Sequence, residues 1–301
     1  MTGSQGRVSV VIPNYQGQSL LEKNLPKVMV ASKNPKNDIG EIIVVDDGSI
    51  DGSVNLLKSQ FPAVKLILHK KNKGFVCSVN DGVRAATRDF VCLLNTDVIP
   101  SFDFLEKVLP HFKRGEVFGV SLNEIGANWT WTKGVFQEGN IGYERGAKDN
   151  KVHETFWVSG GSGVFRKSLW TLLGGMDEKL FSPFYWEDLD LCYRATKRGY
   201  RVLWEPGAGV EHKHESTMSL LPQGYVARIK ERNHLLFNWK NLTSPNLFRK
   251  HLGGLVGRVL KHPGYIRIVL MALPKLGTVH ARRRQEMKEC KVSDESILAR
   301  N

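Results

Sequence analysis

The chain has few cysteines, and their spacing fits no metal or redox motif. Its 301 residues include four cysteines, which lie far apart and contain no Cys-x-x-Cys pair. We therefore expect neither a zinc site nor a disulfide framework, and we expect the protein to reside in a reducing compartment. The sequence also has no apolar run long enough to span a membrane and no apolar signal-peptide core near its start. We therefore expect a cytoplasmic protein.

Two common phosphate-binding motifs are missing as well. No Gly-x-Gly-x-x-Gly follows the first apolar run, and no Gly-Lys-Ser or Gly-Lys-Thr occurs. These absences argue against a dinucleotide-binding Rossmann protein and a P-loop enzyme. Acidic residues are outnumbered, 30 against 43 Lys and Arg, which gives a net charge of +13. The basic excess suits nucleic acid, an anionic membrane or a phosphorylated ligand. Because no nucleic-acid recognition motif accompanies it, we do not expect a nucleic-acid partner.

The first hundred residues alternate between short apolar runs and segments of helical spacing. The apolar runs occupy residues 8–12, 41–45, 64–68 and 90–94. This alternation predicts an α/β fold with a doubly wound parallel sheet, whose ligands bind at the carboxyl ends of the strands. Residues 116–156 show no clear regular element, and Trp129 and Trp131 are interpreted as one face of a strand rather than as a sugar-stacking pair.

Polar residues follow two of the predicted strands. Asp46 and Asp47 come after the second, where they suit donors on a base or a ribose; the alternative is a turn before a helix cap. Asn95 and Asp97 come after the fourth. Side chains two positions apart point to the same side of an extended segment, so this pair suits a divalent cation on a diphosphate. A simple turn is again the alternative.

Three carboxylates, Glu187, Asp188 and Asp190, lie within four positions between aromatic residues and leucines. One interpretation places them in a cleft, where burial raises the pKa of a carboxyl group and makes it a proton acceptor. The other makes them the first turn of a helix, whose positive end favours acidic residues. This stretch alone does not choose between the two.

These segments together resemble a known family. They are Val-Ser-Val-Val-Ile-Pro-Asn-Tyr at 8–15, Asp-Asp-Gly-Ser at 46–49, Asn-Lys-Gly-Phe at 72–75, Asn-Thr-Asp at 95–97 and Trp-Glu-Asp-Leu-Asp-Leu at 186–191. Their order resembles family 2 glycosyltransferases of the GT-A fold, close to rhamnosyltransferase-like bacterial and archaeal members. The resemblance implies a GT-A domain over residues 1–241, with a mostly parallel central sheet flanked by helices, and a C-terminal helical extension over 242–301.

The resemblance also implies an activity and its ligands. It implies an inverting glycosyltransferase of cell-envelope glycan synthesis, which takes a sugar from a nucleotide-diphospho-sugar donor to a saccharide or polyprenyl-linked acceptor. Asp188 would be the general base, and Asp97 and His212 would hold Mg²⁺ or Mn²⁺. Asn95 stands where the family's Asp-x-Asp motif has a first carboxylate, so strict metal dependence is not implied. The donor nucleotide would contact Pro13, Asn14, Tyr15, Asp46, Asp47, Gly74, Asn80, Asn95 and Thr96, and the donor sugar or acceptor would contact Gly160, Gly161, Trp186 and Glu187.

The C-terminal extension has a different character. Residues 251–276 mix leucine, isoleucine and valine with Lys and Arg, and are broken at Pro263 and Pro274. Short amphipathic helices of this kind lie on an anionic membrane surface, here the inner face of the cell membrane, or pack on the catalytic domain or a second subunit. Residues 282–301 are expected to form a fraying helix or a tail. His214 is expected to be a surface residue or a phosphate contact, and residues 215–217 are expected to form a loop that closes over the donor.

Two other functions compete with the transferase. A sugar-phosphate nucleotidyltransferase would carry a glycine-rich basic loop after the first strand, and residues 13–17 are not such a loop. A non-catalytic nucleotide- or sugar-binding protein would be compatible with Asn95. The presence of both Asp188 and His212 argues against it.

Overall fold

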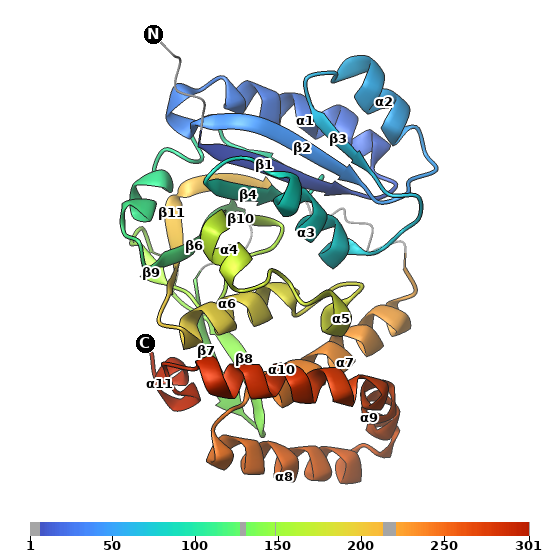
Figure 1. Cartoon of the computed structure of the whole chain (residues 1–301), viewed down its shortest axis with the longest axis vertical. Helices are drawn as coiled ribbons and strands as arrows, with labels where there is room; N and C mark the ends of the chain where they lie inside the picture. Colours follow the sequence, from blue (N-terminus) through green and yellow to red (C-terminus); the bar gives the residue numbers. More distant parts are fainter. Residues whose placement is uncertain (1–6, 127–130, 148, 213–220, 301) are drawn as a thin grey trace.

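The computed structural model describes residues 7–126, 131–147, 149–212 and 221–300. A nine-stranded sheet runs through the molecule in the order β3-β2-β1-β4-β10-β6-β11-β5, with β9 paired to β11 (Figure 1). The strands are β1 (Val8–Asn14), β2 (Ile39–Asp46), β3 (Lys65–Leu68), β4 (Phe90–Leu94), β5 (Val98–Pro100), β6 (Val117–Ile125), β9 (His153–Glu154), β10 (Ser162–Arg166) and β11 (Arg201–His212).

The sheet is parallel in its first half and mixed in its second. Strands β1 to β4 pair in parallel, as the alternating pattern predicts. Strand β10 lies antiparallel to both β4 and β6, while β11 is parallel to β6 and antiparallel to β5 and β9. The predicted α/β class is confirmed, with a mixed sheet flanked by helices. Strand β10 follows β9 without an intervening helix, and an antiparallel strand needs no helical crossover.

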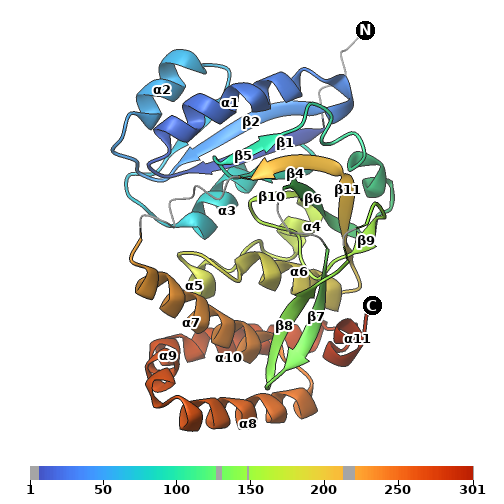
Figure 2. The ribbon, with the colours of Figure 1, turned by 180° about the vertical axis from the view of Figure 1, so that it is seen from behind.

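Helices cover both faces of the sheet. Helices α1 (Gln18–Ser32) and α2 (Ser53–Gln60) lie on one face, and α3 (Phe75–Ala85), α4 (Lys167–Leu172) and α6 (Glu187–Lys197) lie on the other (Figures 1 and 2). Spacings of three and four place Val76, Val79 and Val83 of α3 on one buried stripe. Gly82 lets this helix approach closely, since a Cβ atom there would lie 2.4 Å from Val11 Cγ1. The approach brings the start of α3 to the carboxyl end of the sheet.

A third layer covers α6 on the side away from the sheet. It consists of α5 (Glu178–Phe181), α7 (Gln223–Asn241), α8 (Pro245–Lys261), α9 (Ile266–Ala272), α10 (Leu276–Glu289), α11 (Asp294–Leu298) and the hairpin of β7 (Thr132–Gln137) and β8 (Asn140–Arg145). Short 3-10 turns connect other elements at Pro35–Asn37, Leu109–Lys113, Pro263–Tyr265 and Leu273–Lys275. Side chains of α5, α6, α7 and the C-terminal helices share one hydrophobic cluster.

The structure corrects the expectation of no regular element at 116–156. Strand β6 crosses the sheet there, and β7, β8 and β9 follow. Gly119, Asn123 and Glu124 interrupt the apolar pattern of β6, which hid the strand from the sequence pattern. Trp131 precedes β7 and stacks on His153, with 4.2 Å between ring centroids. The expectations for Trp129, His214 and residues 215–217 lie outside the described residues.

The end of the chain is also different from the expected fraying helix or tail. Glu286 of α10 and Asp294 of α11 are only 2% and 1% exposed. Arg198 pairs with Glu286 at 2.8 Å, and the carbonyl of Lys197 accepts hydrogen bonds from the backbone of Lys291 and Val292. The polar composition conceals this packing because the buried polar groups are paired with one another. In the described part of the chain, no helix is both long enough and apolar enough to cross a bilayer.

A buried ion-pair network fixes the middle of α6. Asp190 is fully buried and accepts hydrogen bonds from Arg194 at 2.8 Å, Lys240 at 2.9 Å and Asn241 at 2.8 Å. Burial would raise the pKa of Asp190, but the charges of Lys240 and Arg194 outweigh it and hold that pKa below its ordinary value. Asp190 therefore ties α6 to α7, which sets the position of the acidic residues at the start of α6.

Candidate active site

Polar side chains gather where β1 and β2 end. Asn14 is buried and donates to Asp46 Oδ2 at 2.7 Å, and Asp46 Oδ1 accepts from the backbone of Ser49 at 2.9 Å. Among the described residues, the buried Asn14 Oδ1 has no hydrogen-bond partner. Pro13 and Tyr15 flank this asparagine and are partly buried. The sheet thus presents an acceptor and two partly covered side chains at the edge where open α/β sheets bind ligands.

Asp47 organises the loop before α3. It is 3% exposed; its Oδ1 accepts from His69 Nδ1 at 2.7 Å and from the Lys73 backbone at 2.9 Å, and its Oδ2 accepts from the Gly74 backbone at 2.8 Å. Gly74 has φ +92°, a conformation that side chains disfavour. A carboxylate has about four acceptor positions, so Asp47 retains room for about one further donor.

Asn80 joins α3 to the loop before α5. Its Nδ2 donates to the Met176 carbonyl at 2.8 Å and to Glu178 Oε1 at 2.9 Å, and its Oδ1 accepts from the Met176 backbone at 3.1 Å. Both the nitrogen and the oxygen of the Asn80 side-chain amide are therefore hydrogen-bonded within the protein. The predicted contact of Asn80 with a donor nucleotide stays a prediction, as do those of Pro13, Tyr15 and Thr96.

The two predicted metal ligands lie beside each other. His212, at the end of β11, points Nε2 to Asp97 Oδ1 at 3.2 Å and Nδ1 to Glu124 Oε1 at 2.8 Å. Burial lowers the pKa of His212, but its hydrogen bonds to Asp97 and Glu124 outweigh burial and raise the pKa to about 9. Sequence reasoning missed Glu124, because a lone glutamate within a strand gives no signal until β6 and β11 are known to be neighbours.

These residues fit a divalent cation. Asp97 Oδ2 is buried and has no hydrogen-bond partner among the described residues. A carboxylate and an imidazole that share a proton in a hydrogen bond can bind a cation in its place, because metal binding releases that proton and uses the same lone pairs. No three His, Cys, Asp or Glu side chains of the described residues form a complete metal cluster. The protein's own ligands would thus be Asp97 and His212, with Asn95 adding no charge.

The loop that leads into β10 connects this pair to the acidic residues of α6. Gly160 donates its backbone N–H to Asp188 Oδ2 at 3.0 Å, and the Gly161 carbonyl accepts from the backbone of Asn95 at 2.9 Å. Ser162 Oγ donates to Glu124 Oε1 at 2.9 Å. A Cβ atom on Gly161 would lie 2.5 Å from Asn95 Nδ2, so a larger residue would displace that amide. Three successive residues thus hold Asp188, Asn95 and Glu124 in one site.

Glu187 and Asp188 occupy the first turn of α6 with different surroundings. Glu187 is buried, and its Oε2 has no partner among the described residues. Burial and the neighbouring Asp188 charge raise the pKa of Glu187 well above its ordinary value. Burial also raises the pKa of Asp188, while backbone donors at Gly160 and Leu189 oppose the rise. The pair therefore favours a neutral Glu187 beside an ionised Asp188.

Two aromatic residues near these acids differ from expectation. The Trp186 ring lies in the core rather than against a sugar: it is 7% exposed and stacks on His234 at 4.1 Å. Tyr143 of β8 was missed, because the hairpin that carries it was not predicted. Burial and the Asp188 charge raise the pKa of Tyr143, so its hydroxyl group stays protonated near the acidic pair. Tyr143 therefore lies close enough to Asp188 to feel its charge.

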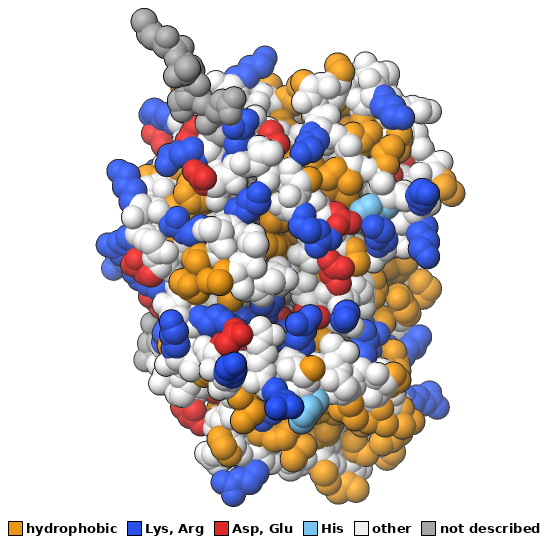
Figure 3. Space-filling model, in the orientation of Figure 1, with side chains coloured by type: hydrophobic (Ala, Val, Ile, Leu, Met, Phe, Trp, Pro, Cys, Tyr) orange, Lys and Arg blue, Asp and Glu red, His pale blue; other side chains and the backbone are white. Residues whose placement is uncertain are grey.

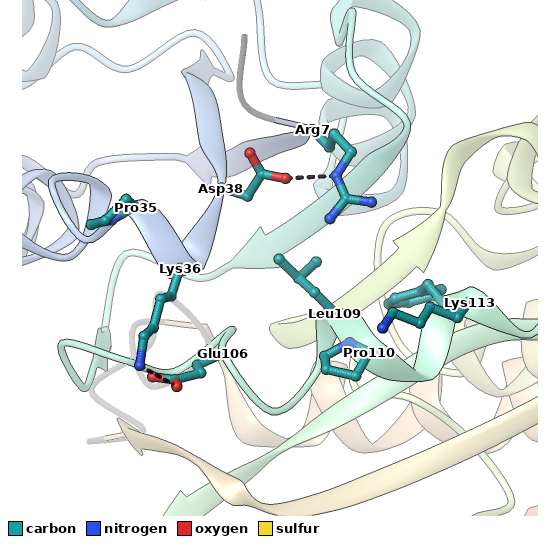
Figure 4. A pocket seen from close by; sticks show the side chains of 9 residues that line it. Arg7, Pro35, Lys36, Asp38, Glu106, Leu109, Pro110 and Lys113 are labelled. Carbon is teal, nitrogen blue, oxygen red and sulfur yellow. Dashed lines mark hydrogen bonds and ion pairs between the residues drawn. The ribbon is translucent and has the colours of Figure 1, made fainter. Parts of the chain in front are cut away.

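A hollow of about 500 Å³ lies at the opposite edge of the sheet (Figure 4). Arg7 pairs there with Asp38, and Lys36 pairs with Glu106, each at 2.6 Å. Arg7 precedes β1, and Lys36 and Asp38 precede β2, whereas Asn14 and Asp46 stand at the other ends of the same strands. The hollow is therefore separate from the candidate active site.

Comparison with known sequences shows which proteins this chain resembles. The sequence model described as "Glycosyl transferase family 2" matches residues 9–173. A pre-mycofactocin glycosyltransferase of Mycobacterium tuberculosis is 31% identical over 188 residues, which cover 59% of this chain and 38% of that relative. The chain thus spans well under half of that protein's length. An N-acetylglucosaminyl-diphospho-decaprenol L-rhamnosyltransferase of the same species is 26% identical over 72% of this chain and 80% of its own.

Comparison with solved structures confirms the GT-A fold. The mannosyltransferase PcManGT from Pyrobaculum calidifontis, solved with GDP-Man and Mn²⁺, aligns over 95% of this chain and 84% of its own, with a TM-score of 0.54 and 18% identity. Staphylococcus aureus TarS 1-349, solved with UDP-GlcNAc, aligns over 94% of this chain and 89% of its own, with a TM-score of 0.52 and 15% identity. At these identities the likeness shows the fold alone.

Proposed function

Because the chain belongs to glycosyl transferase family 2, we propose that it is an inverting glycosyltransferase that uses a nucleotide-diphospho-sugar donor. The observation that carries this proposal is the loop at residues 160–162, which joins Asp188, Asn95 and Glu124 by three hydrogen bonds. The proposed proton acceptor Asp188 is thereby tied to the neighbours of the proposed cation ligands Asp97 and His212. A direct displacement at an anomeric carbon needs both groups close to the reacting atoms.

Asp188 is the general base of this reaction. It is partly exposed, so an acceptor can reach it, and two backbone N–H groups favour its ionised form. The acceptor hydroxyl group gives its proton to Asp188 while its oxygen forms a bond to the anomeric carbon from the face opposite the diphosphate. The bond from that carbon to the diphosphate oxygen breaks in the same step, so the configuration inverts. Glu187 is buried beside Asp188, and in its neutral form it leaves the negative charge of the pair on Asp188.

Asp97 and His212 are the residues that hold the Mg²⁺ or Mn²⁺ of the donor complex. When bound there, the cation neutralises charge on the leaving diphosphate. Asn14, Asp46 and Asp47 lie at the neighbouring strand ends, where the nucleoside of the donor would bind. Glu124 fixes the His212 ring so that Nε2 faces Asp97.

The acceptor is a saccharide or a polyprenyl-linked saccharide of the cell envelope. The name of the mycobacterial rhamnosyltransferase specifies a diphospho-decaprenol acceptor, and the alignment with it covers most of both chains. Such an acceptor sits at a membrane, so we place the protein on the cytoplasmic face of the cell membrane. The transferred sugar is a hexose or a deoxyhexose such as rhamnose.

The test is donor hydrolysis and donor binding across a panel of nucleotide sugars, with Mn²⁺ or with a chelator. Asp188→Asn keeps the shape of the site, so donor binding should persist while turnover falls by about 10²- to 10⁴-fold. Asp103→Asn, at an exposed residue outside the cluster, is the matched control and should retain full activity.

Each outcome separates the competing functions. Binding of a donor with turnover lost only in Asp188→Asn supports the transferase. Formation of a nucleotide sugar from a nucleoside triphosphate and a sugar phosphate would instead identify a nucleotidyltransferase, which the family match disfavours. If neither nucleotide sugars nor nucleotides stabilise the protein, the transferase proposal fails.

A further inference from the structure

Exposed apolar side chains gather on the C-terminal helices. Seven of the sixteen large hydrophobic residues that are exposed in the described part of the chain lie within residues 252–276. They define what we call the docking face, and they are Leu252, Val256, Leu260, Ile266, Leu270, Leu273 and Leu276. A contiguous apolar surface of this kind marks an interaction site.

The apolar residues of the docking face are spaced so that they lie on one side of each helix. Leu252, Val256 and Leu260 recur every four residues along α8, so they lie on one side of that helix. Ile266, Leu270 and Leu273 repeat the pattern along α9 and the turn after it. In Figure 3, hydrophobic side chains cover the lower right of the molecule, where α8 and α9 lie in Figure 1.

The opposite sides of both helices are already used by the fold. Leu247 and His251 of α8 are buried, as are Ile268 and Ala272 of α9. Leu247 and Ala272 belong to the hydrophobic cluster shared with α6 and α7. The sequence left open whether these helices pack on the catalytic domain or face a partner. In the structure, one side of each helix packs on the rest of the molecule, and the other side is exposed.

The charge of this segment has one sign. Residues 245–276 contain six Lys and Arg and no Asp or Glu, and no acidic residue occurs between Glu231 and Glu286. Arg249, Lys250, Lys261 and Arg267 are exposed. Basic residues beside exposed leucines and isoleucines are typical of helices that lie in the interface of an anionic bilayer.

We propose that the docking face binds the surface of an anionic lipid bilayer. The charge argues against a second copy of the chain, because a symmetric contact would bring together two helical segments that carry Lys and Arg but no Asp or Glu. An anionic bilayer complements the charge and takes up the apolar side chains within its headgroup region. The attachment is peripheral, because no described helix could span the membrane. This inference uses only the surface and does not depend on the proposed enzymatic function.

The experiment is co-sedimentation of the full chain with vesicles of phosphatidylcholine alone or with about 30% phosphatidylglycerol added. We expect binding to the anionic vesicles, weak binding to the neutral ones, and a decrease at high salt. Reversing two charges with Lys261→Glu and Arg267→Glu should weaken binding about tenfold or more. Leu260→Ser with Leu270→Ser should also weaken it, because these variants remove apolar burial without changing charge.

The matched control is Lys58→Glu with Leu172→Ser, which makes the same kinds of change at exposed residues outside the docking face. All variants should keep the thermal midpoint and the vesicle-free donor hydrolysis of the wild type. If the wild type hydrolyses no donor, that result counts against the proposed function and leaves the proposed membrane binding of the docking face untouched. Equal binding to both vesicle types, or unchanged binding by both sets of docking-face variants, would overturn the inference. A wild-type dimer that Leu260→Ser dissociates would replace the bilayer with a second copy.

Discussion

Replacing Asp294 with alanine should destabilise the whole fold, although this residue lies only seven positions before the last residue of the sequence. Asp294 is 1% exposed and pairs with the fully buried Lys197 Nζ at 2.9 Å. It also accepts from the Tyr193 hydroxyl group at 2.8 Å and from the backbones of Thr243 at 2.6 Å and Ser244 at 2.7 Å. The alanine variant leaves a buried ammonium group without its counter-charge.

The expected magnitude follows from that geometry. Removing one partner of a buried ion pair lowers the free energy of unfolding by about 3–5 kcal/mol. For a chain of this size, about 2 °C of Tm per kcal/mol converts this to a decrease of about 6–10 °C. Glu295→Ala is the matched control: Glu295 is the exposed neighbour, and its loss should change stability by less than about 1 kcal/mol.

The assay is equilibrium unfolding in urea, followed by tryptophan fluorescence and circular dichroism. We expect one coincident transition that moves to lower urea in Asp294→Ala, because residues 242–301 share a hydrophobic cluster with α6 and α7. The reasoning would be refuted by equal midpoints for the two variants. It would also be refuted by an early transition confined to the C-terminal helices, with donor binding intact, which would make residues 242–301 a separate domain.

Two further predictions concern the site itself. Burial raises the pKa of Asp188 and of Glu187, and the proposed base Asp188 acts only when ionised. The value of kcat/KM should therefore fall on acidification at a pH above the ordinary carboxyl range. A pH–rate profile checks this, and the acidic limb of the profile should be absent from the residual activity of Asp188→Asn. Glu124→Gln should weaken Mn²⁺ binding about 10-fold or more by loosening the His212 ring, measured by calorimetry with a nucleoside diphosphate present. Glu144→Gln, at an exposed residue of β8, is its control, and equal affinities in the two variants would show that Glu124 does not position the imidazole.

The sequence predicts the parts of this fold that depend on local pattern. The β-branched run at Val8–Ile12 and the valine stripe of α3 are readable because periodicity and burial coincide there. Strand β6 was not predicted, since Gly119 and Glu124 break its pattern and only its neighbours β10 and β11 make it a buried strand. Local patterns cannot identify a strand whose burial is created by partners distant in the sequence.

The same limit applies to the site. Family motifs point to Asp97, Asp188 and His212, and the structure places the first beside the third and connects both regions through the loop before β10. Glu124 and Tyr143 have no motif, because they enter the site through sheet pairing and a hairpin. Trp186 lies within a motif yet packs in the core, where its ring supports the turn that starts α6.

Helix α6 explains why a tail-like C-terminus matters for the chemistry. Its first turn holds Glu187 and Asp188, whose raised pKa values mean that the folded state disfavours their ionisation. Their contribution to stability is therefore present at low pH and is lost as the pH rises through those values. The proposed base Asp188 has to be ionised to act, so other contacts have to hold the helix. Asp190 and Lys197 supply them, by pairing with α7 and with Asp294 of α11. Through Asp294 and the shared hydrophobic cluster, residues 242–301 thus help to hold the start of α6 and its acidic pair in place.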